Sequence, residues 1–202
     1  MIQNPRRFEE AIARIDAANA EDPNLELDRG AEHPKELLYA RRMTRMLATF
    51  SPGAPEELQL AVRAQHIQRW KTPRGSYPMD RQGYLQWRTG LYRFHAETVG
   101  RILEELGYDE GAISRVKAAV GKQGLKENPE TQLLEDVSGL VFLQYSLPGF
   151  AASHPDWDEA KWLEILRKTW RKLSPAARDF VLAGKIQLSE DLKPLVLKAV
   201  TV

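Results

Sequence analysis

The segment spanning residues 63–95 concentrates basic and aromatic side chains. It carries seven Lys and Arg residues against a single acid, Asp80, whereas the whole chain has 29 Lys and Arg against 28 Asp and Glu. Arginine binds phosphate and carboxylate groups through paired hydrogen bonds, and arginine and aromatic rings stack on planar ligands. We therefore expect this segment to bind a small anionic, phosphorylated ligand. The side chains expected to contact it are Arg69, Trp70, Arg74, Tyr77, Arg81, Trp87 and Arg88.

Several polar side chains interrupt apolar helical runs and need partners, because buried polar groups are costly when left unsatisfied. Histidine and carboxylate groups brought together from separate helices are suitable ligands for Mn, Fe, Zn or Co. The expected metal ligands are Glu36, His66, His95 and Asp136, and the expected catalytic residues are Gln65 and Glu135. Two alternatives stay open: His66 as a core histidine held by a partner side chain, and Glu36 as an acid that favours the start of a helix.

The elements that position these residues are predicted to be helices, because apolar residues recur at helical spacing and no stretch alternates as a strand would. We predict an all-α protein, a single compact bundle over residues 1–202. Proline, glycine and capping residues mark the helix ends. Helices are expected over residues 8–15, 34–47, 55–67, 80–107, 109–120 and 156–173, with two more starting at Pro129 and Pro175 and a loop over residues 72–79.

Composition excludes several classes of function. The chain has no cysteine, so it has no disulfide and no thiolate nucleophile or ligand. Its net charge of +1 argues against nucleic-acid binding by bulk charge. Phosphate-binding GxxxxGK[ST], dinucleotide-binding GxGxxG and hydrolase GxSxG motifs are missing. The polar N-terminus and the lack of an 18-residue apolar stretch predict a cytoplasmic protein without a membrane partner.

Six strings along the chain resemble the bacterial and fungal family defined by domain of unknown function 4202. The resemblance covers nearly the whole chain and implies a family without a settled activity. The strings are Tyr39-Ala-Arg-Arg-Met-Thr44, Gln65-His-Ile-Gln-Arg-Trp70, Pro73-Arg-Gly-Ser-Tyr-Pro-Met-Asp-Arg81, Gly83-Tyr84 with Trp87-Arg88, Leu134-Glu-Asp136 with Leu140-Val-Phe-Leu143, and Leu166-Arg-Lys-Thr-Trp170.

The chain also distantly resembles the HD-domain phosphohydrolases, helical bundles that bind metal through His, a His-Asp pair and a later Asp. Glu36 stands where the first histidine would lie, Gln65-His66 where the pair would lie, and Asp136 where the last aspartate would lie. The resemblance implies an HD-domain-like bundle, a divalent metal and phosphohydrolysis. Glutamine and histidine in place of the His-Asp pair depart from the family's metal ligands.

Three functions are consistent with these residues. The first is a metal-assisted, hydrolase-type activity on a small anionic, phosphorylated substrate. The second is a metal-free module that binds a nucleotide or RNA through residues 63–95. The third is a structural or partner-binding role, in which arginines pair with buried acids such as Glu135 and Asp136 to hold helices together. The oligomeric state stays open.

Overall fold

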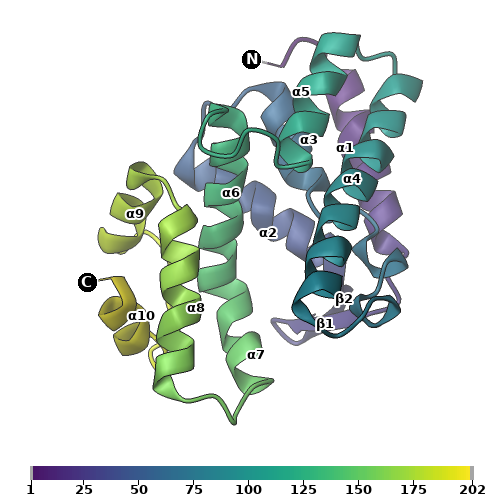
Figure 1. Cartoon of the computed structure of the whole chain (residues 1–202). Coiled ribbons are helices and arrows are strands. Elements are labelled where there is room, and N and C mark those ends of the chain that lie inside the picture. Colours follow the sequence, from purple (N-terminus) through teal and green to yellow (C-terminus); the bar gives the residue numbers. More distant parts are fainter. Residues whose placement is uncertain (1, 201–202) are drawn as a thin grey trace. The chain divides into compact units, whose positions relative to one another are not determined.

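The structure is a computed structural model that describes residues 2–200. Contacts along the chain divide it into two compact units, residues 1–134 and 135–202. The single domain expected over residues 1–202 stays a prediction. Figure 1 labels the elements, whose bounds are α1 (Pro5–Ala20), β1 (Leu25–Asp28), β2 (Ala31–Pro34), α2 (Lys35–Phe50), α3 (Glu56–Ala64), η1 (Arg69–Lys71), η2 (Arg74–Ser76), α4 (Arg81–Glu105), α5 (Glu110–Val120), α6 (Pro129–Val141), η3 (Phe142–Ser146), α7 (Leu147–Ala152), α8 (Glu159–Lys172), α9 (Pro175–Leu182) and α10 (Lys193–Val200).

The predicted helical character is confirmed, and the capping residues explain several boundaries. The Asp80 side chain accepts a hydrogen bond from the Gly83 amide at 2.7 Å, and Asp109 accepts one from Ala112 at 2.9 Å. Such side chains satisfy amide groups that have no partner within the first turn. Gly107, at φ +71°, follows α4 in a conformation that glycine adopts without strain.

The all-α prediction missed a small β-hairpin. Strands β1 and β2 pair antiparallel, with Leu25 opposite Pro34 and Asp28 opposite Ala31. Arg29 and Gly30 between the strands both have positive φ, at 51° and 82°, which suits a tight two-residue hairpin turn. Four-residue strands of mixed polarity give too short an alternation to be recognised in the sequence.

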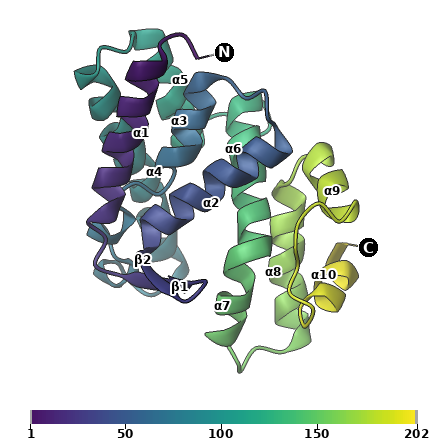
Figure 2. The same ribbon diagram turned by 180° about the vertical axis from the view of Figure 1, so that it is seen from behind.

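Helix α3 is the central element of the first unit. It packs against α1, α2, α4 and α5, and its side chains Leu60, Ala61, Val62 and Ala64 are fully buried. Figures 1 and 2 both show α1, α3, α4 and α5 running side by side. The helix ends at Ala64, which corrects the predicted extension to residue 67. Residues 65–68 continue as tight turns from the right-handed Gln65, and the right-handed path stops at Gln68, which is left-handed, at φ 52° and ψ 33°.

The second unit contains the end of α6 and the helices α7 to α10. Helix α8 packs against α10, and the buried side chains include Leu140, Leu166 and Leu173. A Cβ atom at Gly139 would lie 2.6 Å from Leu173 Cδ2, so a larger residue there would force the buried Leu173 side chain to shift. Among the described helices of both units, none is long and apolar enough to cross a membrane.

Candidate functional site

Glu36 is a buried carboxylate at the first turn of α2. Its side chain is 8% exposed, and its backbone amide donates to Asp22 Oδ2 at 3.0 Å. Its Oε2 lies 3.3 Å from His66 Nδ1, and its Oε1 lies 4.0 Å from Arg69 Nε. Burial raises the pKa of Glu36 to about 7, the charge of Arg69 opposes the rise, and the charge of Asp22 adds to it. The carboxyl group therefore exchanges a proton near neutral pH.

His66 lies in the turn that follows α3, not on the helix itself as predicted. Its ring stacks on Tyr39, with ring centroids 4.2 Å apart, and its Nε2 lies 3.2 Å from Arg69 Nη1. A guanidinium can only donate, so Nε2 accepts this hydrogen bond. The neutral imidazole then carries its proton on Nδ1, which faces Glu36. Glu36, His66 and Arg69 thus form one connected chain of polar groups.

His95 contributes a second buried imidazole from α4. Its ring centroid lies 5.9 Å from that of His66, and its Nδ1 donates to the Ile67 carbonyl at 2.8 Å, because a carbonyl oxygen can only accept. Burial is the main cause that lowers the pKa of His95 to about 3, and proximity to His66 and Arg69 adds to it, so the ring is neutral near pH 7. Its Nε2 is therefore an acceptor, and it has no hydrogen-bond partner within residues 2–200.

Several cations of the first unit act on His66. Burial lowers the pKa of His66 well below its ordinary value, and nearby cations lower it further. These cations are Arg69, Lys122, Lys35 and Arg88. They come from four separate parts of the first unit, and Arg69 contacts the ring directly, at 3.2 Å. Such a field attracts anions.

The arginine and aromatic residues of segment 63–95 lie beside this cluster. The Arg69 guanidinium stands 5.0 Å from the Trp87 ring centroid, and Trp87 Nε1 donates to the Thr72 carbonyl at 2.8 Å. Arg88 donates to the hydroxyl groups of Tyr92 and of Tyr84, the latter at 3.0 Å. The hydrogen bond to Thr72 fixes the Trp87 ring, which gives Arg69 a flat surface on which to stack.

The loop after η1 uses Arg74 differently. Arg74 donates to the carbonyl groups of Tyr77, at 3.1 Å, and of Asp80, at 3.3 Å. Its guanidinium therefore closes the loop on itself. Trp70 and Tyr77 are partly buried, whereas Arg81 is exposed at the start of α4. Contact of these residues with a ligand stays a prediction.

The acid pair Glu135–Asp136 belongs to the second unit, and its partners there are structural. Asp136 Oδ1 accepts from the Ser174 amide at 2.7 Å, at the start of α9. Glu135 Oε1 lies 3.5 Å from Lys172 Nζ at the end of α8. Both carboxylates are almost fully buried. The sequence predicted that Glu135 and Asp136 share a site with Glu36, and this stays a prediction.

The arrangement of Glu36, His66 and His95 fits a metal only in part. Metal-binding histidines usually donate their other nitrogen to a fixed acceptor, as His95 donates to Ile67, and its Nε2 lone pair is available. However, His66 Nε2 accepts from Arg69. Across residues 2–200, no group of three or more His, Asp or Glu side chains is placed to hold an ion.

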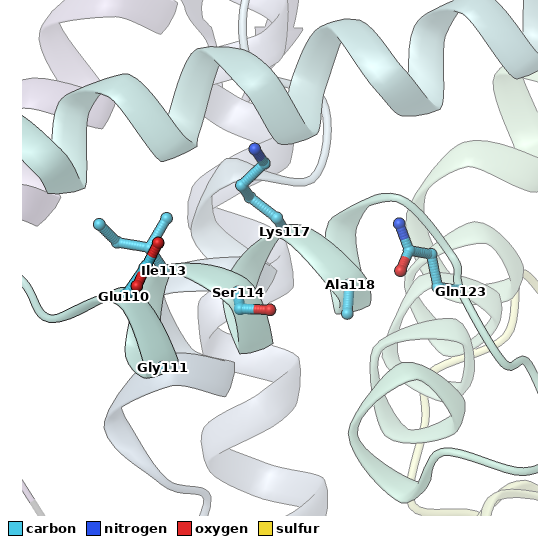
Figure 3. A pocket seen from close by; sticks show the side chains of 7 residues that line it. All are labelled: Glu110, Gly111, Ile113, Ser114, Lys117, Ala118 and Gln123. Carbon is cyan, nitrogen blue, oxygen red and sulfur yellow. The ribbon is translucent and has the colours of Figure 1, made fainter.

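A pocket on the surface of α5 contains none of the predicted site residues. Its lining includes Glu110, Ser114, Lys117 and Gln123, as Figure 3 shows. The predicted site is therefore separate from this hollow.

Sequence reasoning missed residues that help to build the cluster. Asn19 is fully buried, and its Oδ1 accepts from the Gln68 amide at 3.0 Å. An asparagine near the end of an amphipathic helix gives a weak signal, because that position also suits a solvated side chain. Lys35, next to Glu36 in the chain, and Lys122 contribute positive charge that acts on His66, from which both are distant in sequence.

The fold and the cluster define a mostly helical protein with a buried carboxylate beside a partly buried histidine and arginine. The chain belongs to the domain of unknown function family DUF4202, which it matches over residues 9–196. Comparison with curated proteins and with solved structures finds no match. The family is therefore established, and the site must be interpreted from its own geometry.

Proposed function

We propose that the first unit binds a small phosphorylated substrate at the Glu36–His66–Arg69 cluster and carries out hydrolase-type chemistry on it. The observation that supports this proposal is the contact of Arg69 with the neutral His66 ring, at 3.2 Å, beside the Glu36 carboxyl group, which has a pKa of about 7. Cations draw a phosphate group to the cluster, and a carboxyl group that titrates near neutral pH can exchange protons with it.

Arg69 is the principal anion-binding residue of the proposed site. Its guanidinium already contacts His66 and the Trp87 ring, so a phosphate oxygen would meet a pre-oriented donor. Arg88 is held by two tyrosine hydroxyl groups and supplies further positive charge. Trp87, fixed by its hydrogen bond to Thr72, would flank an apolar or aromatic part of the substrate.

Glu36 is the proposed acid and base. A bound phosphate would favour its protonated form, since two negative charges repel. As the phosphorus–oxygen ester bond breaks, Glu36 would give its proton to the leaving oxygen. A water oxygen would bond to phosphorus, and a proton of that water would return to Glu36. His66 holds the Glu36 carboxyl group through Nδ1.

A metal-assisted form of this activity is a second candidate, favoured by the available lone pair of His95 Nε2 next to the cluster. Glu36 and His95 would hold the ion, and a bound divalent metal would lower the pKa of water and polarise the substrate. A relationship with the HD-domain phosphohydrolases would favour this metal-assisted activity. The proximity of Glu36 and His66 supports that proposed relationship. The roles predicted for Gln65, Glu135 and Asp136 also belong to it.

Binding of a nucleotide or RNA is an alternative that one observation favours. Tyr84 is 40% exposed, and the Arg74 guanidinium lies 6.0 Å from the ring centroids of both Tyr84 and Trp87. Aromatic rings beside cations are a common platform for bases of single strands. Quenching of tryptophan fluorescence by oligonucleotides, without hydrolysis, would support this alternative.

The test combines binding and turnover in the variant His66→Ala. We expect its affinity for pyrophosphate, measured by calorimetry, to fall about tenfold, the equivalent of one charge-assisted hydrogen bond. Unfolding in urea should show a smaller effect, below about 1 kcal/mol. Release of phosphate from a panel of phosphomonoesters should fall as well, and chelator treatment shows whether a metal takes part.

His33→Ala is the matched control, because His33 lies in the hairpin strand β2 and is partly buried. It should leave affinity and turnover unchanged. A loss of about 1–3 kcal/mol of stability in His66→Ala with unchanged pyrophosphate affinity would instead make His66 a core histidine. The proposal would then be wrong.

A further inference from the structure

The turn from Gln65 to Gln68 presents His66 to the cluster, and Arg69 follows it directly. Gln68 adopts a left-handed conformation, at φ 52° and ψ 33°, which is unfavourable for residues other than glycine. Strained backbone of this kind persists only where surrounding contacts impose it. The contacts that impose it here come from two other helices.

Two buried side chains hold the same peptide group of the turn, the one that joins Ile67 to Gln68. Asn19, at the end of α1, accepts through Oδ1 from the Gln68 amide at 3.0 Å. His95, on α4, donates to the carbonyl group of Ile67 at 2.8 Å. Asn19 is fully buried and His95 is 2% exposed, so water cannot readily replace either contact.

The conformation of Gln68 decides where the next residue points. Arg69 begins η1 directly after it, and the Arg69 amide donates to the His66 carbonyl at 3.0 Å. The backbone thus returns Arg69 to His66, where Nη1 meets Nε2 at 3.2 Å. A right-handed Gln68 would continue the helical path of α3 and change this direction.

We propose that Asn19 is a positioning residue of the site: by binding the Gln68 amide it maintains the left-handed conformation that directs Arg69 onto His66. The inference rests on the proposed function for its ligand, and it assigns a role to a side chain outside segment 63–95. Asn19 touches no substrate. It acts through the backbone, and its effect reaches the ligand through Arg69.

Three variants test the role. Asn19→Ala removes the acceptor, Gln68→Gly removes the cost of the left-handed conformation, and the double variant combines them. We expect Asn19→Ala to weaken pyrophosphate binding about tenfold and the double variant to recover most of that loss, because glycine adopts positive φ without strain. Gln68→Gly alone should bind as the wild type does. A purely structural Asn19 would give no rescue by glycine.

A second readout does not depend on a ligand. Nitrogen-15 NMR of the imidazole rings, with His66 assigned through His66→Gln, reports which ring nitrogen carries the proton. The wild type should show His66 protonated on Nδ1. Asn19→Ala should shift the ring toward the mixture of tautomers that we expect in Arg69→Ala, which lacks the donor to Nε2. Asn19→Leu, of similar volume, replaces Asn19→Ala if that variant does not fold.

The two readouts separate failure of this inference from failure of the proposed function. If the wild type binds no pyrophosphate but the tautomer of His66 depends on Asn19, the positioning role holds and the proposed ligand is wrong. An unchanged His66 tautomer in Asn19→Ala and Asn19→Leu, or an affinity loss that Gln68→Gly leaves in place, would overturn the positioning role.

Discussion

Two groups of buried polar residues, one in each unit, differ in how completely they are satisfied. In the second unit, Asp136 accepts from the Ser174 amide and Glu135 lies beside Lys172. In the first unit, Glu36 has a pKa raised to about 7, and the buried Nε2 of His95 has no partner among the described residues. Contacts of the first kind join helices, whereas perturbed and unsatisfied groups are typical of ligand sites. The comparison therefore favours the first unit as the location of the proposed site.

The largest expected effect is on the pH dependence of stability, and Glu36→Gln reveals it. Burial raises the pKa of Glu36 from an ordinary 4.5 to about 7. The raised pKa contributes stability that is fully present below pH 4.5 and is lost as pH rises through about 7. We expect the stability of the wild type relative to Glu36→Gln to fall by up to about 3 kcal/mol between pH 4.5 and 8, measured by urea unfolding.

The groups that face Glu36 are the same in the wild type and in Glu36→Gln. The difference between their pH profiles of stability therefore reports the Glu36 carboxyl group alone. The facing groups are Asp22, Lys35, Arg69, His66 and His95. The lowered pKa values of the two histidines produce the opposite trend, a gain of stability as pH rises toward 6.5, in both proteins. The exposed carboxylate Glu97 provides the control Glu97→Gln. Parallel pH profiles of the wild type and Glu36→Gln would remove the distinction between the two units.

Asp136→Ala tests the second unit, and its expected effect on stability is somewhat smaller. Loss of the hydrogen bond from the Ser174 amide should cost about 2 kcal/mol of stability, because a partly buried amide loses a charged acceptor. Asp136→Asn keeps an acceptor oxygen and should cost less. Pyrophosphate affinity should not change in either variant. A clear loss of affinity would instead support the sequence prediction that Asp136 belongs to the ligand site.

Much of the helical framework could be predicted from the sequence, because caps and apolar spacing act locally. Asp80 and Asp109 cap the predicted helices through contacts with amides three residues ahead. The end of α3 could not be predicted, because the left-handed Gln68 depends on Asn19, which lies 49 residues away. Short strands escaped recognition for the same reason, since their pairing outweighs a weak local preference.

The candidate site, like the fold, could be predicted from the sequence only in part. Glu36 and His66 were recognisable as polar residues in apolar surroundings, and the structure brings them within 3.3 Å. The individual roles of the arginines were not recognisable, because every arginine of segment 63–95 has the same donors. Only the fold shows that Arg69 contacts His66, while Arg74 binds carbonyl groups of its own loop. Chemical type can be read from the sequence, but the partner of each side chain depends on the tertiary structure.

The smallest expected effect distinguishes these two arginines within the first unit. Arg74→Lys loses hydrogen bonds to the Tyr77 and Asp80 carbonyl groups, one of them largely exposed to solvent, so stability should fall by less than about 1 kcal/mol. Its pyrophosphate affinity should stay within about twofold of the wild type, whereas Arg69→Lys should lose about tenfold, because an ammonium group cannot reproduce the planar guanidinium that meets His66 and Trp87. Calorimetric titration of both variants under identical salt conditions makes the comparison. Equal losses in the two variants would show that the loop closes on the anion and that Arg74 leaves its carbonyl partners to bind it.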